Sequence, residues 1–286
     1  MNKVSKERIE ELQRISTRIR ESIIEMLVSA GSGHTAGPLG FTDVLVSLYF
    51  QVMKYDPKKP SWEHRDRFIL SHGHICPALY ATMAHAGYFP TSELLTLRRF
   101  GSRLQGHPHR EFLPGIETSS GPLGCGLSQA VGMALGLQLS TKETRVFVGI
   151  SDGELQEGNT WEALMSAAHY KLSNLTVIID RNHIQIDGFT ETIMGLDPLF
   201  DKIQSFNYDV CEINGHNFEE IISKLSEKNT TGKPRCIIAK TIPGKGIPLF
   251  ENKFEWHGKP PTGKDVDIAL NALRSLEGAI NAPHHH

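Results

Sequence analysis

Residues 145–188 read RVFVGISDGELQEGNTWEALMSAAHYKLSNLTVIIDRNHIQIDG, and this stretch decides the fold class. An apolar run ends at Ile150, a segment with helical spacing of its apolar residues follows, and a second apolar run covers residues 175–179. This order predicts a strand, a loop, a helix and a second strand, which is the repeating unit of a parallel sheet. We therefore expect an α/β fold with a mainly parallel open sheet and helices on both faces.

A polar residue follows each of these two predicted strands. Asp152 comes after the first, and Asn182 comes after the second, about thirty positions later. Because the carboxyl ends of neighbouring parallel strands lie side by side, the two side chains can converge on one ligand. An Asp carboxylate, an Asn amide oxygen and a main-chain carbonyl are the ligands that Mg²⁺ or Ca²⁺ prefers. The alternative is that Asp152 caps the helix and Asn182 makes a turn, and spacing alone leaves both readings open.

The flanking segments continue the alternation of helices and strands, without an internal repeat or a clear linker. Helices are expected at residues 6–29, 42–50, 77–86, 91–100, 218–227 and 265–276, and strands at 66–70, 208–213 and 236–239. Another helix follows Gly121, with small residues at every fourth position that suit packing against the sheet or a second subunit, or simply a core helix. We expect residues 1–282 to form a single domain and residues 283–286, Pro-His-His-His, to be the remnant of an expression tag.

Composition excludes several classes of protein. The 286 residues are 39% hydrophobic and 22% charged, which is typical of a globular protein. The net charge of −2 gives no electrostatic reason to expect nucleic acid, and no apolar run is long enough to suggest a membrane span. The polar start lacks the apolar region of a secretory signal, and four dispersed cysteines without a CxxC pair fit reduced thiols. We expect a cytoplasmic protein.

Four histidines lie in glycine-bearing loops: His34, His74, His107 and His257. Imidazoles in such loops can donate to phosphate oxygens or exchange protons near neutral pH, so a shared pocket would suit a diphosphate cofactor and a polyhydroxylated substrate. A lone loop histidine is more often a surface residue, and the sequence by itself does not show whether the four converge. The glycines after Gly121 do not match the GxGxxG fingerprint, which weakens a nicotinamide reading.

The motifs resemble those of a known family. The segment from Ser151-Asp152-Gly153 to Asn182 is similar to the thiamine diphosphate signature, a GDG followed by an Asn. Six motifs occur in the order found in transketolase: SGHTAGPLG from Ser32, SHGH from Ser71, GHP from Gly106, GPLG from Gly121, DGELQEG from Asp152 and WHGKPP from Trp256. The resemblance covers nearly the whole chain and corresponds to the N-terminal, diphosphate-binding half of transketolase. It implies the thiamine-diphosphate-binding fold.

The resemblance also implies roles for single residues at the diphosphate. Asp152 and Asn182 would hold Mg²⁺ or Ca²⁺ through side-chain oxygens, and Ile184 through its main-chain carbonyl, so that Asn182 serves both metal and cofactor. The N–H of Gly153 and the ring of His74 would contact the diphosphate, where the absence of a Cβ lets backbone donors approach.

Other residues would face the rings of thiamine diphosphate and the sugar. Gly121 and Leu123 would face the aminopyrimidine and thiazolium. His34, His107 and His257 would line the substrate channel as catalytic residues that bind ketose hydroxyls and move protons, with His257 also near the diphosphate.

Two acidic residues suggest a contact between subunits. In the family, carboxylates at the positions of Glu157 and Glu162 link paired active sites, which implies self-association. The alternative for both is that of first-turn acids that stabilise a helix N-terminus.

The departures from the family pattern are also informative. Ser151 stands where the family usually has the first Gly of GDG, which narrows the room beside the cofactor but leaves Asp152 intact. The glutamate that activates the cofactor in this family, and the residues that grip the sugar phosphate, belong to the missing half. We therefore expect one subunit of a split transketolase that needs a separate C-terminal subunit, in a heterotetramer of two copies of each.

The expected reaction is transfer of a two-carbon ketol unit from a ketose or ketose phosphate to an aldose. One alternative is another thiamine diphosphate enzyme related to deoxyxylulose-phosphate synthase, which the GHP and WHGKPP motifs disfavour. Another is a non-catalytic paralogue, for which degraded ligands would be the signature. The choice among pentose phosphates, branched sugars and sulfosugars stays open.

Overall fold

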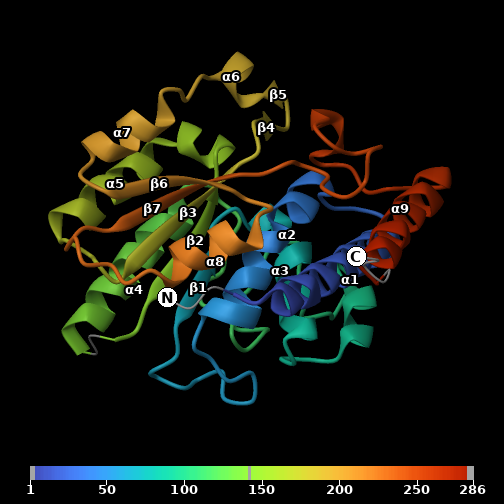
Figure 1. Ribbon diagram of the computed structural model, residues 1–286, viewed down its shortest axis with the longest axis horizontal. Helices are drawn as coiled ribbons and strands as arrows, with labels where there is room; N and C mark the ends of the chain where they lie inside the picture. Colours follow the sequence, from blue (N-terminus) through green and yellow to red (C-terminus); the bar gives the residue numbers. More distant parts are fainter. Residues whose placement is uncertain (1–3, 141–142, 282–286) are drawn as a thin grey trace.

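The central sheet consists of parallel strands in the order β1-β2-β3-β7-β6 (Figure 1). The structure, a computed structural model, describes residues 4–140 and 143–281. The strands are β1 (Arg67–Leu70), β2 (Val146–Ser151), β3 (Leu175–Arg181), β6 (Asp209–Asn214) and β7 (Arg235–Lys240). The predicted parallel sheet is confirmed, and its carboxyl edge carries the residues that follow β2 and β3.

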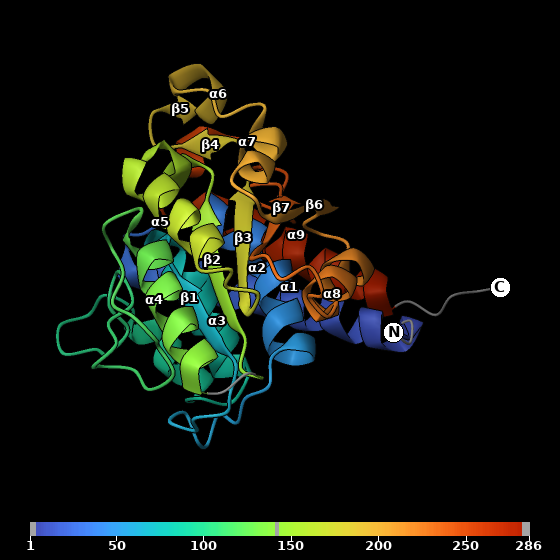
Figure 2. The same ribbon diagram turned by 90° about the vertical axis from the view of Figure 1, so that its left-hand side faces the viewer.

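Helices cover both faces of this sheet (Figure 2). One face packs against α1 (Lys6–Ala30), α2 (Ala36–Ser47), α3 (Cys76–His85) and α8 (Phe218–Ser226). The other packs against α4 (Cys125–Ser140), α5 (Gly158–His169) and α7 (Leu199–Ser205). The last helix, α9 (Lys264–Asn281), lies alongside α1 (Figure 1). The predicted α/β class is therefore confirmed.

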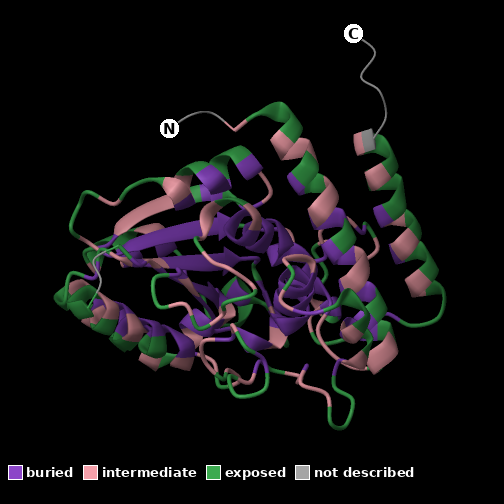
Figure 3. Cartoon of the chain, turned by 90° about the horizontal axis from the view of Figure 1, so that it is seen from below, coloured by how far each residue is buried: buried purple, intermediate pink, exposed green. Residues whose placement is uncertain are grey.

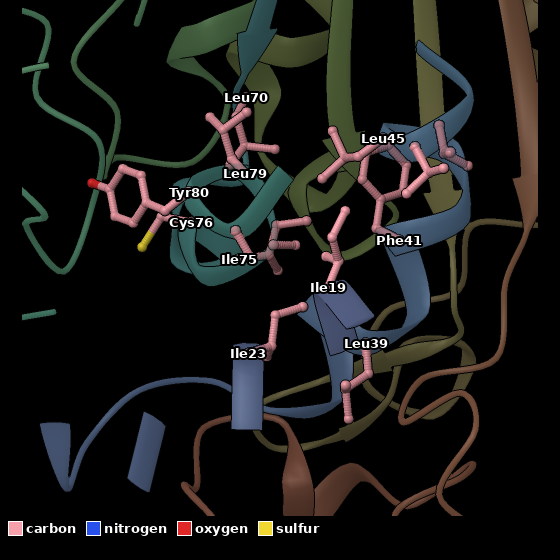
Figure 4. Close-up of a cluster of buried hydrophobic side chains, with 14 of the residues drawn as sticks. Ile19, Ile23, Leu39, Phe41, Leu45, Leu70, Ile75, Cys76, Leu79 and Tyr80 are labelled. Atoms are coloured by element: carbon pink, nitrogen blue, oxygen red, sulfur yellow. The ribbon is translucent and has the colours of Figure 1, made fainter. Parts of the chain in front are cut away.

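β2 and the middle residues of β3 and β7 are buried and apolar because both of their faces are covered. Phe147 packs into the cluster on the α2 face, and the next residue, Val148, packs into the cluster on the α4 face. Every residue of β2 is buried, as the colouring in Figure 3 shows for the strands in the middle of the molecule. Figure 4 shows part of the packing on the α2 face, where Phe41 and Leu45 of α2 belong to the same buried cluster as Ile19 and Ile23 of α1.

Two predicted helices have different bounds from those expected. The helix expected from Thr42 already begins at Ala36, so half of the predicted glycine-rich loop is helical, and a π-helix (Leu48–Val52) ends it. The helix expected over residues 91–100 is wrong, because only a 3₁₀ helix (Thr91–Thr96) forms. Leu97 and then Arg98 leave the helical region, and Arg98 takes a left-handed φ of 60° that a helix does not accommodate.

A small projection stands above the carboxyl edge of the sheet. It contains the hairpin of β4 (Ile184–Gln185) and β5 (Gly188–Phe189), followed by α6 (Thr190–Ile193) (Figures 1 and 2). Short 3₁₀ helices also mark three functional loops: Gly73–Ile75, Gly153–Gln156 and Phe254–Trp256.

One alternative for the small residues at every fourth position of α4 was that they pack against the sheet, and they do not. A side chain at Gly132 or Gly136 would meet no atom within 4 Å, whereas Leu127, Ala130 and Ala134 are buried. The sheet-packing interpretation of these glycines is wrong, and a contact with a second subunit there stays a prediction. Within the described residues, no helix is long and apolar enough to cross a membrane. The predicted tag remnant, residues 283–286, lies outside the described residues.

Candidate active site

The first half of the site forms where β2 and β3 end. Ser151 pairs with Asp180 in the sheet, so Asp152 emerges beside the loop that follows β3. The Asp152 N–H donates to the Asp180 carbonyl at 3.1 Å, and Asp152 Oδ2 accepts from the His183 N–H at 2.7 Å. The structure thus brings Asp152 together with the loop that contains Asn182, as the parallel pairing predicted.

Asn182 and Ile184 are buried on the same loop. The Asn182 Nδ2 donates to Asp180 Oδ2 at 3.0 Å, and its Oδ1 accepts from the Ile184 N–H at 3.0 Å. Asp152 Oδ1 accepts from the Gly153 N–H at 2.8 Å, which caps the short 3₁₀ helix. The capping and turn geometry that formed the alternative reading is therefore present together with the convergence.

Burial governs the charge of this cluster. Asp152 is fully buried, and its desolvation raises its pKa to about 6, against the lowering effect of the His183 N–H and the Arg181 guanidinium. Arg181 Nη1 lies 3.2 Å from Asp152 Oδ2, and its Nη2 contacts Glu191 and Asp197. Burial also raises the pKa of Asp180 to about 7. Asp180 and Arg181 were not among the predicted site residues, although they directly follow the second apolar run and precede Asn182.

The donor set fits a hard divalent cation. It offers a carboxylate on Asp152, an amide oxygen on Asn182 and the main-chain carbonyl of Ile184, which are oxygen ligands of the type that Mg²⁺ and Ca²⁺ take. Among the described residues, no group of three His, Cys, Asp or Glu side chains is arranged to hold a metal. A metal at this position would therefore rest on mixed side-chain and main-chain oxygens.

The second half of the site is a cluster of histidines from three distant loops. The ring centroids of His34 and His74 are 4.8 Å apart, those of His74 and His257 are 5.2 Å apart, and those of His34 and His257 are 5.5 Å apart. His72, which sequence reasoning left without a role, joins the two halves: its ring lies 6.0 Å from that of His74, and its Nε2 lies 4.0 Å from Asp180 Oδ2. These imidazoles therefore converge beside the carboxyl edge of the sheet.

The histidines are neutral at pH 7 and partly without partners. Burial lowers the pKa of His34 and of His257 to about 4, and it also lowers that of His74 well below its ordinary value. The Nδ1 atoms of His34 and His257 are buried and make no hydrogen bond. Because buried polar atoms in folded proteins are nearly always paired, these two nitrogens indicate a place for ligand atoms.

His107 and the GPLG turn lie next to the cluster. A Cβ on Gly73 would approach His107 Cδ2 to 3.4 Å, and one on Gly121 would approach His107 Cγ to 3.9 Å. Much of His107 is exposed, but partial desolvation of its ring, together with the positive charge of Arg98, lowers its pKa. Leu123 is half-buried in the same turn. All four predicted histidines and the GPLG residues thus belong to one region of the surface.

Glu154 ties the loops of the site together, and the sequence did not reveal this role. Its fully buried carboxylate accepts from the Ser71 hydroxyl, from the Gly124 N–H at 2.6 Å and from the Ser151 N–H at 3.4 Å. In return, Ser151 Oγ accepts from the Glu154 N–H at 3.1 Å, which forms a capping box. The serine in place of the family glycine therefore has a structural function.

Two side chains of α3 donate hydrogen bonds to the carbonyls of the GHP loop. The Cys76 thiol and the Tyr80 hydroxyl donate to the carbonyls of Gly106 and Gln105, at 3.2 and 3.0 Å. Figure 4 shows both side chains at one edge of the hydrophobic cluster. Burial raises the pKa of the Cys76 thiol to about 12, so it stays a protonated donor.

The residues expected at a contact between subunits are exposed. Glu157 precedes α5 and makes no side-chain capping hydrogen bond, and Glu162 lies on the exposed side of the helix. The alternative that both are first-turn acids is not supported, because the first turn of α5 contains no acidic residue, and the contact between subunits stays a prediction.

The fold and the site define a protein of the α/β class whose candidate ligand site lies at the carboxyl edge of a parallel sheet. Residues 12–275 match the family model described as "Transketolase, thiamine diphosphate binding domain". The chain therefore belongs to this family, and the prediction that it is one subunit of a transketolase and binds thiamine diphosphate is confirmed.

Several relatives are separate subunits of similar length. One subunit of an apulose-4-phosphate transketolase from Actinobacillus succinogenes is 40% identical over 93% of this chain and 96% of its own length. One subunit of a 6-deoxy-6-sulfo-D-fructose transketolase from Clostridium sp. is 43% identical over 94% of this chain and 98% of its own length. Human transketolase is 36% identical over 91% of this chain, which spans only 41% of that protein.

Solved structures show the same fold. A crystal structure of a transketolase mutant from Pichia stipitis superposes with a TM-score of 0.85 at 28% identity, and the match covers 95% of this chain and 44% of that one. The transketolase of Campylobacter jejuni gives a TM-score of 0.84 at 29% identity, over 94% and 45% of the two chains.

Proposed function

We propose that this chain forms the diphosphate-binding half of a transketolase site that it shares with a separate C-terminal subunit. The reaction is transfer of a two-carbon ketol unit from a ketose or ketose phosphate to an aldose. The observation that carries this proposal is the convergence of Asp152 and the 180–184 loop with three histidine rings 4.8–5.5 Å apart.

In this proposal, Asp152, Asn182 and the Ile184 carbonyl hold Mg²⁺ or Ca²⁺, and the metal holds the diphosphate. When bound, thiamine diphosphate supplies the carbon nucleophile that accepts and passes on the two-carbon unit. Gly153 and His74 contact the diphosphate. The Gly153 N–H now donates to Asp152 Oδ1, so a small rotation of that carboxylate toward a metal would free this donor.

Other residues orient the cofactor rings and the sugar. Gly121 and Leu123 face the rings. His34, His107 and His257 bind sugar hydroxyls, and His257 also approaches the diphosphate. The unpaired Nδ1 atoms of His34 and His257 support this role, because a neutral imidazole can accept a hydroxyl proton at one nitrogen while its other nitrogen donates.

A partner polypeptide completes the site. The relatives of matching length are named as single subunits of a transketolase, whereas this chain spans 41% of human transketolase. The partner would supply the carboxylate that assists proton loss from the cofactor. Glu157 and Glu162 are exposed, so their carboxylates are accessible to a second copy of this chain, as a heterotetramer of two copies of each polypeptide requires. The four free cysteines favour a cytoplasmic location.

The test measures two-carbon transfer by this chain alone and with its neighbour-encoded partner, at equal cofactor and metal concentrations. We expect turnover only from the pair, because in this proposal the partner supplies the group that assists the cofactor. Robust turnover by the chain alone would contradict the split site. If the pair does not bind thiamine diphosphate in a metal-dependent way in a calorimetric titration, the chain is a scaffold and has no catalytic role.

A further inference from the structure

Arg181 is a buried cation beside the carboxylate that would hold the metal. It is the last residue of β3, and its side chain is only 3% exposed. Its Nη1 donates to Asp152 Oδ2 at 3.2 Å and to Thr190 Oγ1 at 3.3 Å. Arg181 directly precedes Asn182, but none of the sequence motifs gives it a role.

The other terminal nitrogen of this guanidinium contacts two carboxylates from α6 and the segment after it. Nη2 donates to Glu191 Oε1 at 2.7 Å and to Asp197 Oδ1 at 3.1 Å. Glu191 is itself held in place, because its carboxylate accepts from the Leu196 N–H at 3.0 Å. The guanidinium therefore bridges Asp152 and the segment that follows the β4-β5 hairpin.

These contacts give the two oxygens of Asp152 different surroundings. Oδ2 accepts from the Arg181 guanidinium at 3.2 Å and from the His183 N–H at 2.7 Å, and two donors occupy both of its lone pairs. Within the described residues, Oδ1 accepts only from the Gly153 N–H, at 2.8 Å. Arg181 thus anchors Oδ2 and leaves Oδ1 as the oxygen with a lone pair for a cation.

The charge of Arg181 is balanced on the side away from Asp152. A guanidinium that faced this carboxylate alone would compete with a divalent cation for its negative charge. Here Glu191 and Asp197 share Nη2, so two negative side chains already accompany the one positive side chain. The contribution that remains at Asp152 is the fixed direction of the carboxylate.

We propose that Arg181 is a positioning residue of the metal site, whose guanidinium fixes the Asp152 carboxylate so that Oδ1 is presented to the cation. The inference rests on the proposed function, in which Asp152 is a metal ligand, and adds the residue that orients this ligand. Hydrogen-bond partners of metal ligands hold them in place, and their loss typically lowers metal affinity by about 10- to 100-fold. Mg²⁺ should depend on Arg181 more than Ca²⁺ does, because Mg²⁺ demands nearly ideal octahedral geometry and Ca²⁺ accepts irregular coordination.

The test titrates Mg²⁺ or Ca²⁺ calorimetrically into the complex of both polypeptides at saturating thiamine diphosphate. We expect Arg181→Met to raise the Kd of Mg²⁺ by about 10-fold or more and that of Ca²⁺ by less than about 3-fold. Arg181→Lys should recover only part of the affinity for Mg²⁺, because one ammonium group does not reproduce the planar fork that contacts Asp152 and Glu191 together.

Arg235→Met is the matched control. The Arg235 side chain is 7% exposed, and its Nε and Nη2 donate to Asp209 Oδ2 at the start of β7, at the opposite end of the strand from the site. Both methionine variants should lower stability, but Arg235→Met should leave the Kd ratio of the two ions unchanged. An equal rise of both Kd values in Arg181→Met would make Arg181 a structural support only, and tighter binding of both ions would make it a competitor of the metal; either result overturns the proposal.

Glu191→Gln tests the same contact in case Arg181→Met does not fold. The Glu191 side chain is 38% exposed, so its replacement leaves no new buried charge. The variant weakens the hold on Nη2 and should raise the Kd of Mg²⁺ by about 3-fold, with a smaller change for Ca²⁺. An unchanged Kd ratio of the two ions in Glu191→Gln would then refute the proposal.

These titrations require no turnover, so they separate this inference from the proposed function. If the wild-type pair transfers no two-carbon unit, the proposed reaction fails, while a loss specific to Mg²⁺ in Arg181→Met still supports the role of Arg181. If the wild-type pair binds thiamine diphosphate without any metal, the inference fails, while two-carbon transfer by the pair would still support the proposed reaction.

Discussion

Replacement of Asp152 by Asn should stabilise the metal-free chain at neutral pH while it removes cofactor binding. Asp152 is fully buried, and its pKa is raised from 3.8 to about 6. The native state therefore holds this proton to higher pH than the unfolded chain, and the free energy of unfolding falls as the pH rises from 3.8 to 6. This difference in pKa corresponds to a loss of about 3 kcal/mol in the free energy of unfolding above about pH 6.

The asparagine side chain of the Asp152→Asn variant would carry no charge but would lose one hydrogen bond. Its amide oxygen can replace Asp152 Oδ2 as acceptor for the His183 N–H, while its NH₂ group would face the Gly153 N–H, at a cost of about 1 kcal/mol. The variant should thus be more stable than wild type by about 2 kcal/mol at about pH 7.5 and less stable by about 1 kcal/mol at about pH 4.

Urea unfolding of the metal-free chain at both pH values measures this change of sign. Asp187→Asn is the matched control, because Asp187 is exposed in the adjacent hairpin, and it should change the free energy of unfolding by less than about 0.5 kcal/mol. In a calorimetric titration, Asp152→Asn should weaken metal-dependent binding of thiamine diphosphate by about 100-fold or more, since a charged ligand is lost. If Asp152→Asn changes the free energy of unfolding with the same sign and size at both pH values, the raised pKa of buried Asp152 is refuted.

Three further substitutions test single contacts. Ser151→Gly removes the acceptor of the Glu154 N–H and should lower the free energy of unfolding in urea by about 1 kcal/mol, with cofactor affinity retained; unchanged stability would contradict the capping box. Glu154→Ala leaves the Gly124 N–H without an acceptor and should cost about 2–3 kcal/mol, and a smaller loss than that of Ser151→Gly would be inconsistent with the three-loop contact. His34→Ala should lower two-carbon transfer by the pair about 100-fold and leave the Kd of the cofactor within a few-fold; a loss of cofactor binding instead would move His34 to the diphosphate.

The sequence predicted the parts of the site that local pattern controls. Apolar periodicity placed β2, α5 and β3, and parallel pairing then brought Asp152 to the loop of Asn182. The capping box is also visible as Ser-x-x-Glu at Ser151 and Glu154. Glu154 also contacts Ser71 and the GPLG turn. These contacts depend on tertiary structure and have no local signal in the sequence.

Convergence over long sequence distances was beyond local reasoning. His34, His74 and His257 lie in loops separated by helices and strands, so only the family resemblance indicated a shared pocket before the structure placed their rings together. Arg98 was read as part of a helix, because apolar spacing does not reveal that one residue takes a left-handed φ.

The pKa values at the carboxyl edge of the sheet explain why Asp152 is suited to bind the cation. Burial raises the pKa of Asp180 and of Glu154 to about 7 and that of Asp152 to about 6, and hydrogen bonds to each carboxyl group oppose this effect. Of these three buried carboxyl groups, Asp152 is the one whose pKa a guanidinium, that of Arg181, lowers. Since the neighbouring histidines are neutral at the same pH, the charge that would attract a divalent cation is concentrated on the residue whose motif predicted a metal ligand.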